Sequence, residues 1–253
     1  MTVAESDDRD RPADADIDVI DVEFVATDLS LAGLLRIDIR RPARATRFLA
    51  SILRPGLEPV TVLDYDLPLA TGAFEFRSSG VWVELCCEAP LDHWTVGLEA
   101  FGLALPEKEV VTPSSFGDRV PIGLDLDLDT IAAPEGDARA FSIEVDVHGE
   151  VLVADQSYEL AATGTRRRNR NGNRRTHPQL QRWGQTPVPT GQEMQRGSDP
   201  GVPTLGELTV AWPVEDGQPS PGLANIERRG WVGGSRPGWF EHDTPSGPTQ
   251  AAE

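Results

Sequence analysis

The chain has 253 residues, with 41 acidic and 23 basic side chains and a net charge of −18. This balance argues against a general nucleic-acid or anionic-membrane binder, because both attract basic surfaces. Lys108 is the single lysine, and its surroundings, Pro106-Glu107-Lys108-Glu109, match no P-loop, kinase or Schiff-base pattern, which argues against those enzyme classes.

The first residues, 1–16, are acidic and lack the apolar stretch of a secretory signal, and we predict that they are disordered. No run approaches the roughly 18 apolar residues of a membrane span. The two cysteines, Cys86 and Cys87, are adjacent in the chain and cannot form an ordinary disulfide staple. We therefore expect a reduced, cytoplasmic protein.

Residues 17–165 are predicted to be the folded part, because apolar and polar residues alternate with period two, which is typical of half-buried strands. In chain order, the alternating segments are 20–24, 35–39, 74–77, 81–86, 94–105, 124–129, 141–147 and 151–153. Turn signals stand at 55–56, 79–80, 89–90, 116–118, 135–137 and 148–149. Segment 44–53 fits a helical face or a strand, and we favour a strand because strand patterns flank it. Many short strands predict an all-β antiparallel barrel or sandwich.

The composition changes near residue 165. Residues 1–165 carry 12 basic and 32 acidic side chains, whereas residues 166–253 carry 11 arginines and 9 acids. Residues 166–253 also contain 11 prolines and 13 glycines, a share typical of low-complexity sequence. We predict a mostly disordered Arg/Pro/Gly-rich tail over 166–253, with a possible strand at 205–214.

Segment 81–101 concentrates polar side chains on one face of a predicted strand pair. With a turn at Pro90, that face carries Trp82, Glu84, Cys86 and Glu88 of the first strand and His93, Thr95, Gly97, Glu99 and Phe101 of the second. If this face lines a barrel interior, Glu84, His93 and Glu99 would act as general acid and base on an apolar ligand. Trp82 or Phe101 would then stack on that ligand. In the alternative interpretation, the same face meets solvent, and the core is formed by Val81, Val83, Leu85, Trp94, Val96 and Leu98.

Two patterns resemble metal sites. His93 could bind a metal with Cys86-Cys87, but adjacent residues of a strand point to opposite faces, and no Cys-x-x-Cys or His-Glu-x-x-His spacing exists. The run Asp125-Leu126-Asp127-Leu128-Asp129 resembles the start of a calcium loop, but Thr130 and Gly136 stand where glycine and glutamate are needed. We therefore predict no metal and no cofactor, and a solvated row of carboxylates on a strand.

Arg166-Arg167-Arg168-Asn169-Arg170 and Arg174-Arg175 form a basic cluster. It could bind RNA or an acidic partner, or it could lie against the acidic folded part of the chain. Because no aromatic residues alternate with these arginines to stack on bases, we predict that nucleic acid is not a partner. A protein partner of the tail remains open.

The residues at 80–101, 117–125 and 149–153 resemble blocks of actinobacterial lipocalin-like proteins similar to the AttH and carotenoid 1,2-hydratase (hydroxyneurosporene synthase) group. The resemblance covers about 30–166. It implies two lipocalin-like β domains and the hydration or other handling of isoprenoid-like lipids. Where such proteins continue into Asp-His-x-Trp-Gly, this chain has Gly164-Thr165-Arg166-Arg167-Arg168, without the acid and the histidine; Gly238-Trp239-Phe240-Glu241 again resembles their closing strand.

We therefore expect an incomplete lipocalin-like barrel or sandwich that binds a hydrophobic, isoprenoid- or lipid-like small molecule, with catalysis left open. One alternative is an acidic β scaffold that acts through protein–protein contacts and uses the tail as a partner-binding segment. Another is a truncated, inactive family member in which 167–235 are frame-shifted. The ratio of 22 arginines to one lysine favours GC-rich coding DNA, which yields Arg, Pro and Gly when read out of frame.

Overall fold

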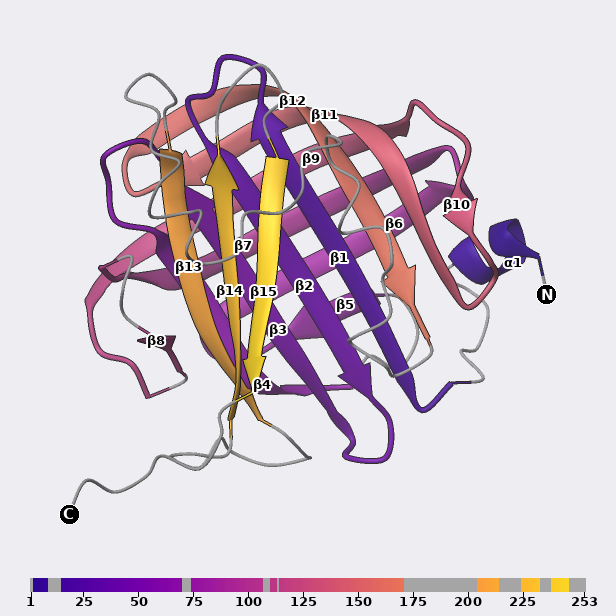
Figure 1. Ribbon diagram of the computed structural model, residues 1–253, viewed down its shortest axis with the longest axis horizontal. Helices are drawn as coiled ribbons and strands as arrows, with labels where there is room; N and C mark the ends of the chain where they lie inside the picture. The colour runs from indigo at the N-terminus through magenta and orange to yellow at the C-terminus, as the bar shows by residue number, and fades with distance from the viewer. Residues whose placement is uncertain are drawn as a thin grey trace.

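The computed structural model describes residues 2–8, 15–69, 74–106, 110–112 and 114–170, together with the strands at 204–213, 224–232 and 238–245. Nearly all strand pairs are antiparallel, and the largest sheet curls into a partial ring (Figure 1). The predicted all-β fold class is therefore confirmed.

The strands of the large sheet are β1 (Ile17–Ala26), β2 (Ala32–Arg40), β3 (Ala45–Leu53), β4 (Val60–Pro68), β5 (Phe74–Arg77), β6 (Val81–Ala89), β7 (His93–Ala104), β9 (Asp118–Thr130), β10 (Glu135–Gly136), β11 (Ala140–Val153) and β12 (Gln156–Asn169). A smaller sheet contains β8 (Val110–Val111), β13 (Thr204–Pro213), β14 (Ala224–Val232) and β15 (Gly238–Pro245). The ring runs β11-β12-β1-β2-β3-β4-β7-β9 and returns to β11, while β6 and β5 branch from β7.

The ring is weakest between β4 and β7, which pair only through Val60 with Ala104 and Thr61 with Leu103. We call this junction the seam. Elsewhere the neighbouring strands pair along most of their length, as β7 and β9 do. An opening between strands is therefore expected at the seam.

The core lies inside the ring and follows the alternation of the sequence. Phe48, Ala50 and Ile52 of β3 point inward and are fully buried, so the ambiguous segment 44–53 is a strand, as predicted. Full burial of a side chain such as Phe48 or Ile52 contributes about 1.5–3 kcal/mol to stability.

The outward faces of β1–β3 are buried as well. Asp21 and Glu23 of β1 and Arg36 and Asp38 of β2 have almost no exposed surface. In Figure 1, β13–β15 are seen in front of β2 and β3, and β13 contacts β3. Burial of these charges is offset by pairing: Arg36 Nε donates to Asp21 at 2.5 Å, and Arg167 Nη1 donates to Glu23 at 2.6 Å.

Both ends of the predicted folded part differ from the prediction. Residues 3–7 form helix α1 (Val3–Asp7) rather than disorder, because Thr2 and Glu5 cap it reciprocally, each side chain accepting from the other backbone N–H. At the other end, β12 continues past residue 165 to Asn169, since its arginines pair with acids of α1 and β1.

Strand β13 lies where 205–214 was predicted to form a strand. The rest of the predicted tail, and with it most of the frame-shift hypothesis, lies outside the described residues, at 171–203, 214–223, 233–237 and 246–253.

The predicted turn at 148–149 is wrong, because β11 passes through both residues. Gly149 has φ +132°, and a Cβ atom there would overlap the Asp125 carbonyl oxygen of β9. Glycine therefore allows a close approach between two strands rather than a reversal of the chain. The period-two alternation of apolar and polar residues also failed to predict strands β4 and β12.

Candidate functional site

The five predicted site residues lie on the outer face of β6 and β7. Trp82 is the Cα partner of Glu99, and Glu84 faces Gly97 across the strand pair. Phe101 is 56% exposed. The buried face consists of Val81, Val83, Leu85, Trp94, Val96 and Leu98. The second interpretation of this strand pair therefore holds, and the polar face does not line the barrel interior.

Trp82 is held on this outer face by polar contacts with β5. Its indole N–H donates to Glu75 Oε1 at 3.1 Å, and the same carboxylate pairs with Arg77. Hydrogen bonds from Arg77 and from Trp82 lower the pKa of Glu75 below its usual value. The indole is thus engaged with the sheet itself.

His93 is held by carboxylates of β9. Its Nδ1 lies 2.8 Å from Asp129, and its Nε2 lies 3.3 Å from Asp127. The hydrogen bond with Asp129, aided by the charges of Asp129, Asp127 and Glu88, raises the pKa of His93 in spite of its partial burial. Cys86 donates to Glu88 at 2.9 Å. Within the described part of the chain, no three His, Cys, Asp or Glu side chains are grouped to hold a metal ion.

A pocket of about 470 Å³ opens at the seam, and we call it the seam pocket. Its walls come from β4 at 61–64, the β5–β6 turn at 78–81, the end of β7, the end of β8 at 111–112, and the segment 115–119 that leads into β9. Of the predicted site residues, Phe101 lines it.

The seam pocket lies where β7 exchanges one neighbouring strand for another. Val81 of β6 pairs with Ala100, and β4 takes over only at Leu103. The exchange depends on Gly102, because a Cβ atom there would stand 2.8 Å from a methyl carbon of Val60. The strand pairing thus leaves a gap beside Phe101.

Arg119 and Phe101 lie together at the seam pocket. The guanidinium carbon of Arg119 stands 5.9 Å from the Phe101 ring centroid, a cation–π arrangement. Phe116, also at the pocket, is 95% exposed. Arg119 forms no ion pair with any residue of the described ranges. The pocket therefore combines exposed aromatic rings with a guanidinium that forms no ion pair among the described residues, and Asp64 is the carboxylate residue of its lining.

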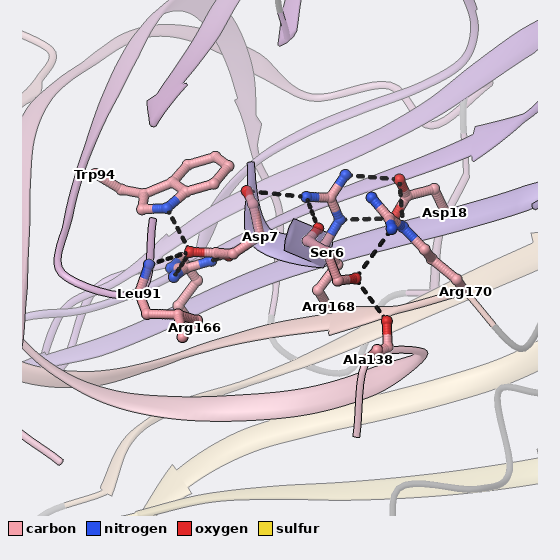
Figure 2. A network of polar contacts seen from close by, with 9 residues as sticks. All are labelled: Ser6, Asp7, Asp18, Leu91, Trp94, Ala138, Arg166, Arg168 and Arg170. Atoms are coloured by element: carbon pink, nitrogen blue, oxygen red, sulfur yellow. Dashed lines mark hydrogen bonds and ion pairs between the residues drawn. The ribbon is translucent and has the colours of Figure 1, made fainter. Parts of the chain in front are cut away.

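A second polar site closes the end of the barrel at which β7 begins, beside α1 (Figure 2). The Asp7 carboxylate accepts from Arg166 at 2.5 and 2.9 Å, from the Trp94 indole N–H at 3.0 Å and from the Leu91 backbone N–H at 2.7 Å. Arg166 also stacks on Trp94, with 4.5 Å between its guanidinium carbon and the ring centroid. Asp7, Trp94 and Arg166 are buried.

The same barrel end holds a second ion-pair group. Arg168 donates to both oxygens of Asp18, at 3.0 and 2.8 Å, and Arg170 donates to Asp18 at 3.3 Å. Arg168 also donates to the Ser6 carbonyl oxygen at 2.8 Å. Burial opposes ionisation of Asp18, but the charges and hydrogen bonds of Arg168 and Arg170 outweigh it and lower the pKa of Asp18.

Sequence reasoning did not identify Arg119 or Asp7 as site residues. For Arg166–Arg170 it left three alternatives, and these arginines lie against the acidic folded part; Arg174-Arg175 lies outside the described residues. A strand through this run would have been a usable signal, since every second residue of a strand shares a face: Arg166, Arg168 and Arg170 then lie on one side and Arg167 on the other.

Comparisons with protein-family models, with curated proteins and with solved structures find no match to this chain. The resemblance to lipocalin-like hydratases therefore remains a prediction. Among the described residues, no helix has the length and apolar character needed to cross a membrane.

Proposed function

We propose that this chain binds an amphipathic small molecule in the seam pocket, with the apolar part of the ligand against Phe101 and an anionic group at Arg119. The proposal narrows the hydrophobic, isoprenoid- or lipid-like ligand expected from the sequence to one that carries a negative charge. The observation that carries it is the placement of Arg119 beside Phe101 at a pocket of about 470 Å³.

The physical properties of the seam pocket support this class of ligand. Its volume falls in the range of about 300–1,000 Å³ that is usual for small-molecule sites. Exposed aromatic rings such as Phe101 and Phe116 gain by covering their apolar surface. An arginine without a carboxylate partner favours an anionic group, and its planar guanidinium suits a carboxylate or phosphate.

The positions of the acidic and basic side chains support ligand binding more than enzymatic hydration of an alkene. Hydration of an alkene requires an acid and a base that face the same cavity. Glu84, His93 and Glu99 lie on the outer face of the sheet, and none of them lines the seam pocket. Any chemistry of the hydratase type would therefore need other residues.

The test is a fluorescence titration of the full chain with 1-anilinonaphthalene-8-sulfonate, a probe with aromatic rings and a sulfonate, followed by displacement with dodecanoate. We expect saturable binding that Arg119→Gln weakens about tenfold, since a charge-assisted contact contributes about 1.5 kcal/mol. Phe101→Ala should weaken it as well. Arg41→Gln, in the exposed β2–β3 turn, is the matched control.

Equal affinities of Arg119→Gln and Arg41→Gln would overturn the proposal, as would the absence of saturable binding to the unchanged chain. An empty, monodisperse protein would favour the alternative in which the chain acts through protein–protein contacts.

A further inference from the structure

Hydrogen-bond donors from separate parts of the chain converge on the carboxylate of Asp7. Arg166 of β12 supplies two bonds, the Trp94 indole of β7 supplies a third, and the Leu91 backbone N–H of the β6–β7 turn supplies a fourth (Figure 2). We propose that this barrel end is a binding site for a small carboxylate ligand, and that α1 fills it with Asp7 of the same chain.

The donors are fixed by contacts that do not involve α1. Arg166 stacks on Trp94, and Arg168 stacks on Phe74 with 5.0 Å between its guanidinium carbon and the ring centroid. The two rings are themselves neighbours, with centroids 6.1 Å apart. Arg168 is also held by Asp18. The stacking contacts and Asp18 are therefore what would hold the positive groups in place when the carboxylate of Asp7 is absent, and a preorganised site requires such support.

The Leu91 N–H points at the carboxylate from an unfavourable backbone conformation. Leu91 has φ +63°, in the left-handed region that residues other than glycine and asparagine seldom adopt. Leu29, Arg44 and Ala154 adopt the same conformation in other hairpin turns, so this backbone shape belongs to the β6–β7 turn itself. Here the outcome is a backbone donor 2.7 Å from the bound carboxylate.

Helix α1 is attached mainly through oxygen acceptors. Besides the Asp7 carboxylate, the carbonyl oxygens of Ser6 and Asp7 accept from Arg168, and Ser6 Oγ accepts from Arg170. Of the residues of α1, only Val3 packs against the core. A helix of five residues is not stable by itself in water. Its position therefore depends on these contacts, which are ones that a carboxylate ligand can reproduce.

The barrel end also keeps a donor that α1 does not use. The Nε atom of Arg166 is buried and has no hydrogen-bond partner among the residues that the structure describes. A buried donor without a partner is costly, and the free energy is recovered when a ligand supplies another acceptor. This favours a carboxylate that carries a further oxygen atom.

The proposal is independent of the seam pocket. Trp94 and Phe101 lie seven residues apart on β7, which at about 3.3 Å per residue separates the two sites by roughly 23 Å. Failure of one proposal therefore leaves the other untouched.

The experiment is a chemical rescue in the full chain. Asp7→Ala removes the carboxylate and leaves room for a free one, and sodium acetate is then added at constant ionic strength, with chloride as the balancing anion. We expect Asp7→Ala to lower the Tm, and acetate to restore about half or more of the loss in a saturable way, because a ligand that binds only the folded state stabilises it. Asp155→Ala, in the exposed β11–β12 turn, is the control and should show no specific response to acetate.

Two further measurements make the outcome decisive. The double variant Asp7→Ala with Arg166→Gln should lose the rescue, and Asp7→Asn, which keeps the shape of the side chain, should show little of it. Equal effects of acetate and chloride on Asp7→Ala overturn the proposal. Failure of both Asp7→Ala and Asp7→Asn to fold, with or without acetate, also overturns it, because Asp7 is then a fixed part of the structure rather than an occupant.

Discussion

Trp82 lies across Gly97 of the neighbouring strand, with an indole carbon 2.9 Å from the position where a Cβ atom of residue 97 would stand. The Cα partner of Gly97 is Glu84, so the indole reaches diagonally over β7. An aromatic ring that covers a glycine on the next strand shields the backbone there from water. This contact gives Trp82 a structural role on the outer face of the sheet.

Gly97→Ala should therefore displace the indole of Trp82 and disturb its hydrogen bond to Glu75. We expect a loss of about 1 kcal/mol in the free energy of unfolding, at the low end for added volume, because the partly exposed ring has room to move. Urea unfolding followed by tryptophan fluorescence measures both effects. Gly80→Ala is the matched control, since nothing lies within 4 Å of a Cβ atom at Gly80; an equal loss in the two variants contradicts the prediction.

The pKa of His93 should fall when its partner on β9 is neutralised. The hydrogen bond with Asp129 is the main cause of the raised pKa, so Asp129→Asn removes most of it, whereas Asp125→Asn should leave it nearly unchanged. NMR titration of the imidazole measures the pKa directly.

The raised pKa of His93 also makes the stability of the folded protein depend on pH, and the direction of the shift decides the direction of that dependence. A histidine whose pKa is raised by folding contributes stability that is fully present below its unfolded pKa of about 6.5, and that is lost as the pH rises through the folded value. Asp129→Asn should therefore destabilise the protein more at about pH 5 than at about pH 9. A destabilisation independent of pH would contradict this assignment.

The strands were predictable where one face of the sheet is buried and the other meets solvent. In 124–129, leucine and aspartate alternate, and the leucines are buried in β9 while the aspartates are exposed. The same rule correctly predicted which residues of β6 and β7 share a face of the sheet, that is, the parity of these strands. Parity does not say which face turns inward, and the polar face of 81–101 also carries Trp82 and Phe101, which suggested an interior.

The two candidate sites depend on contacts that a local pattern does not contain. Asp7 meets Arg166 across 159 positions of the chain, and a short acidic segment gives no sign that it enters a barrel. Arg119 meets Phe101 because β7 and β9 pair in one particular register. Such a register is set by the closure of the whole ring.

Loss of the Asp18 carboxylate should be among the most damaging single changes. Asp18→Asn leaves Arg168 buried without the carboxylate that it contacts twice and removes one contact of Arg170, and removing one partner of a buried ion pair costs about 3–5 kcal/mol. Urea unfolding at neutral pH measures the loss. Asp155→Asn, in an exposed turn, is the control and should change stability little.

Acid should weaken the same contact in the unchanged protein. Because folding lowers the pKa of Asp18, its contribution is present above the unfolded pKa of about 3.9 and is lost as the pH falls through the folded value. The stability difference between the unchanged chain and Asp18→Asn should therefore shrink below about pH 4. A constant difference down to lower pH would show that Asp18 acts through packing alone.

Gly149 offers a test of the close approach between β11 and β9. Its φ of +132° and the overlap of any Cβ atom with the Asp125 carbonyl oxygen leave no room for a side chain. Gly149→Ala should cost at least about 3 kcal/mol, because backbone strain and the displacement of β9 add together. Gly56→Ala separates the two contributions: Gly56 has φ +70° in an exposed turn with nothing within 4 Å, so its variant should lose only the strain, about 1 kcal/mol. Urea midpoints of the two variants compare them directly, and equal losses would show that β9 yields to a methyl group at no measurable cost.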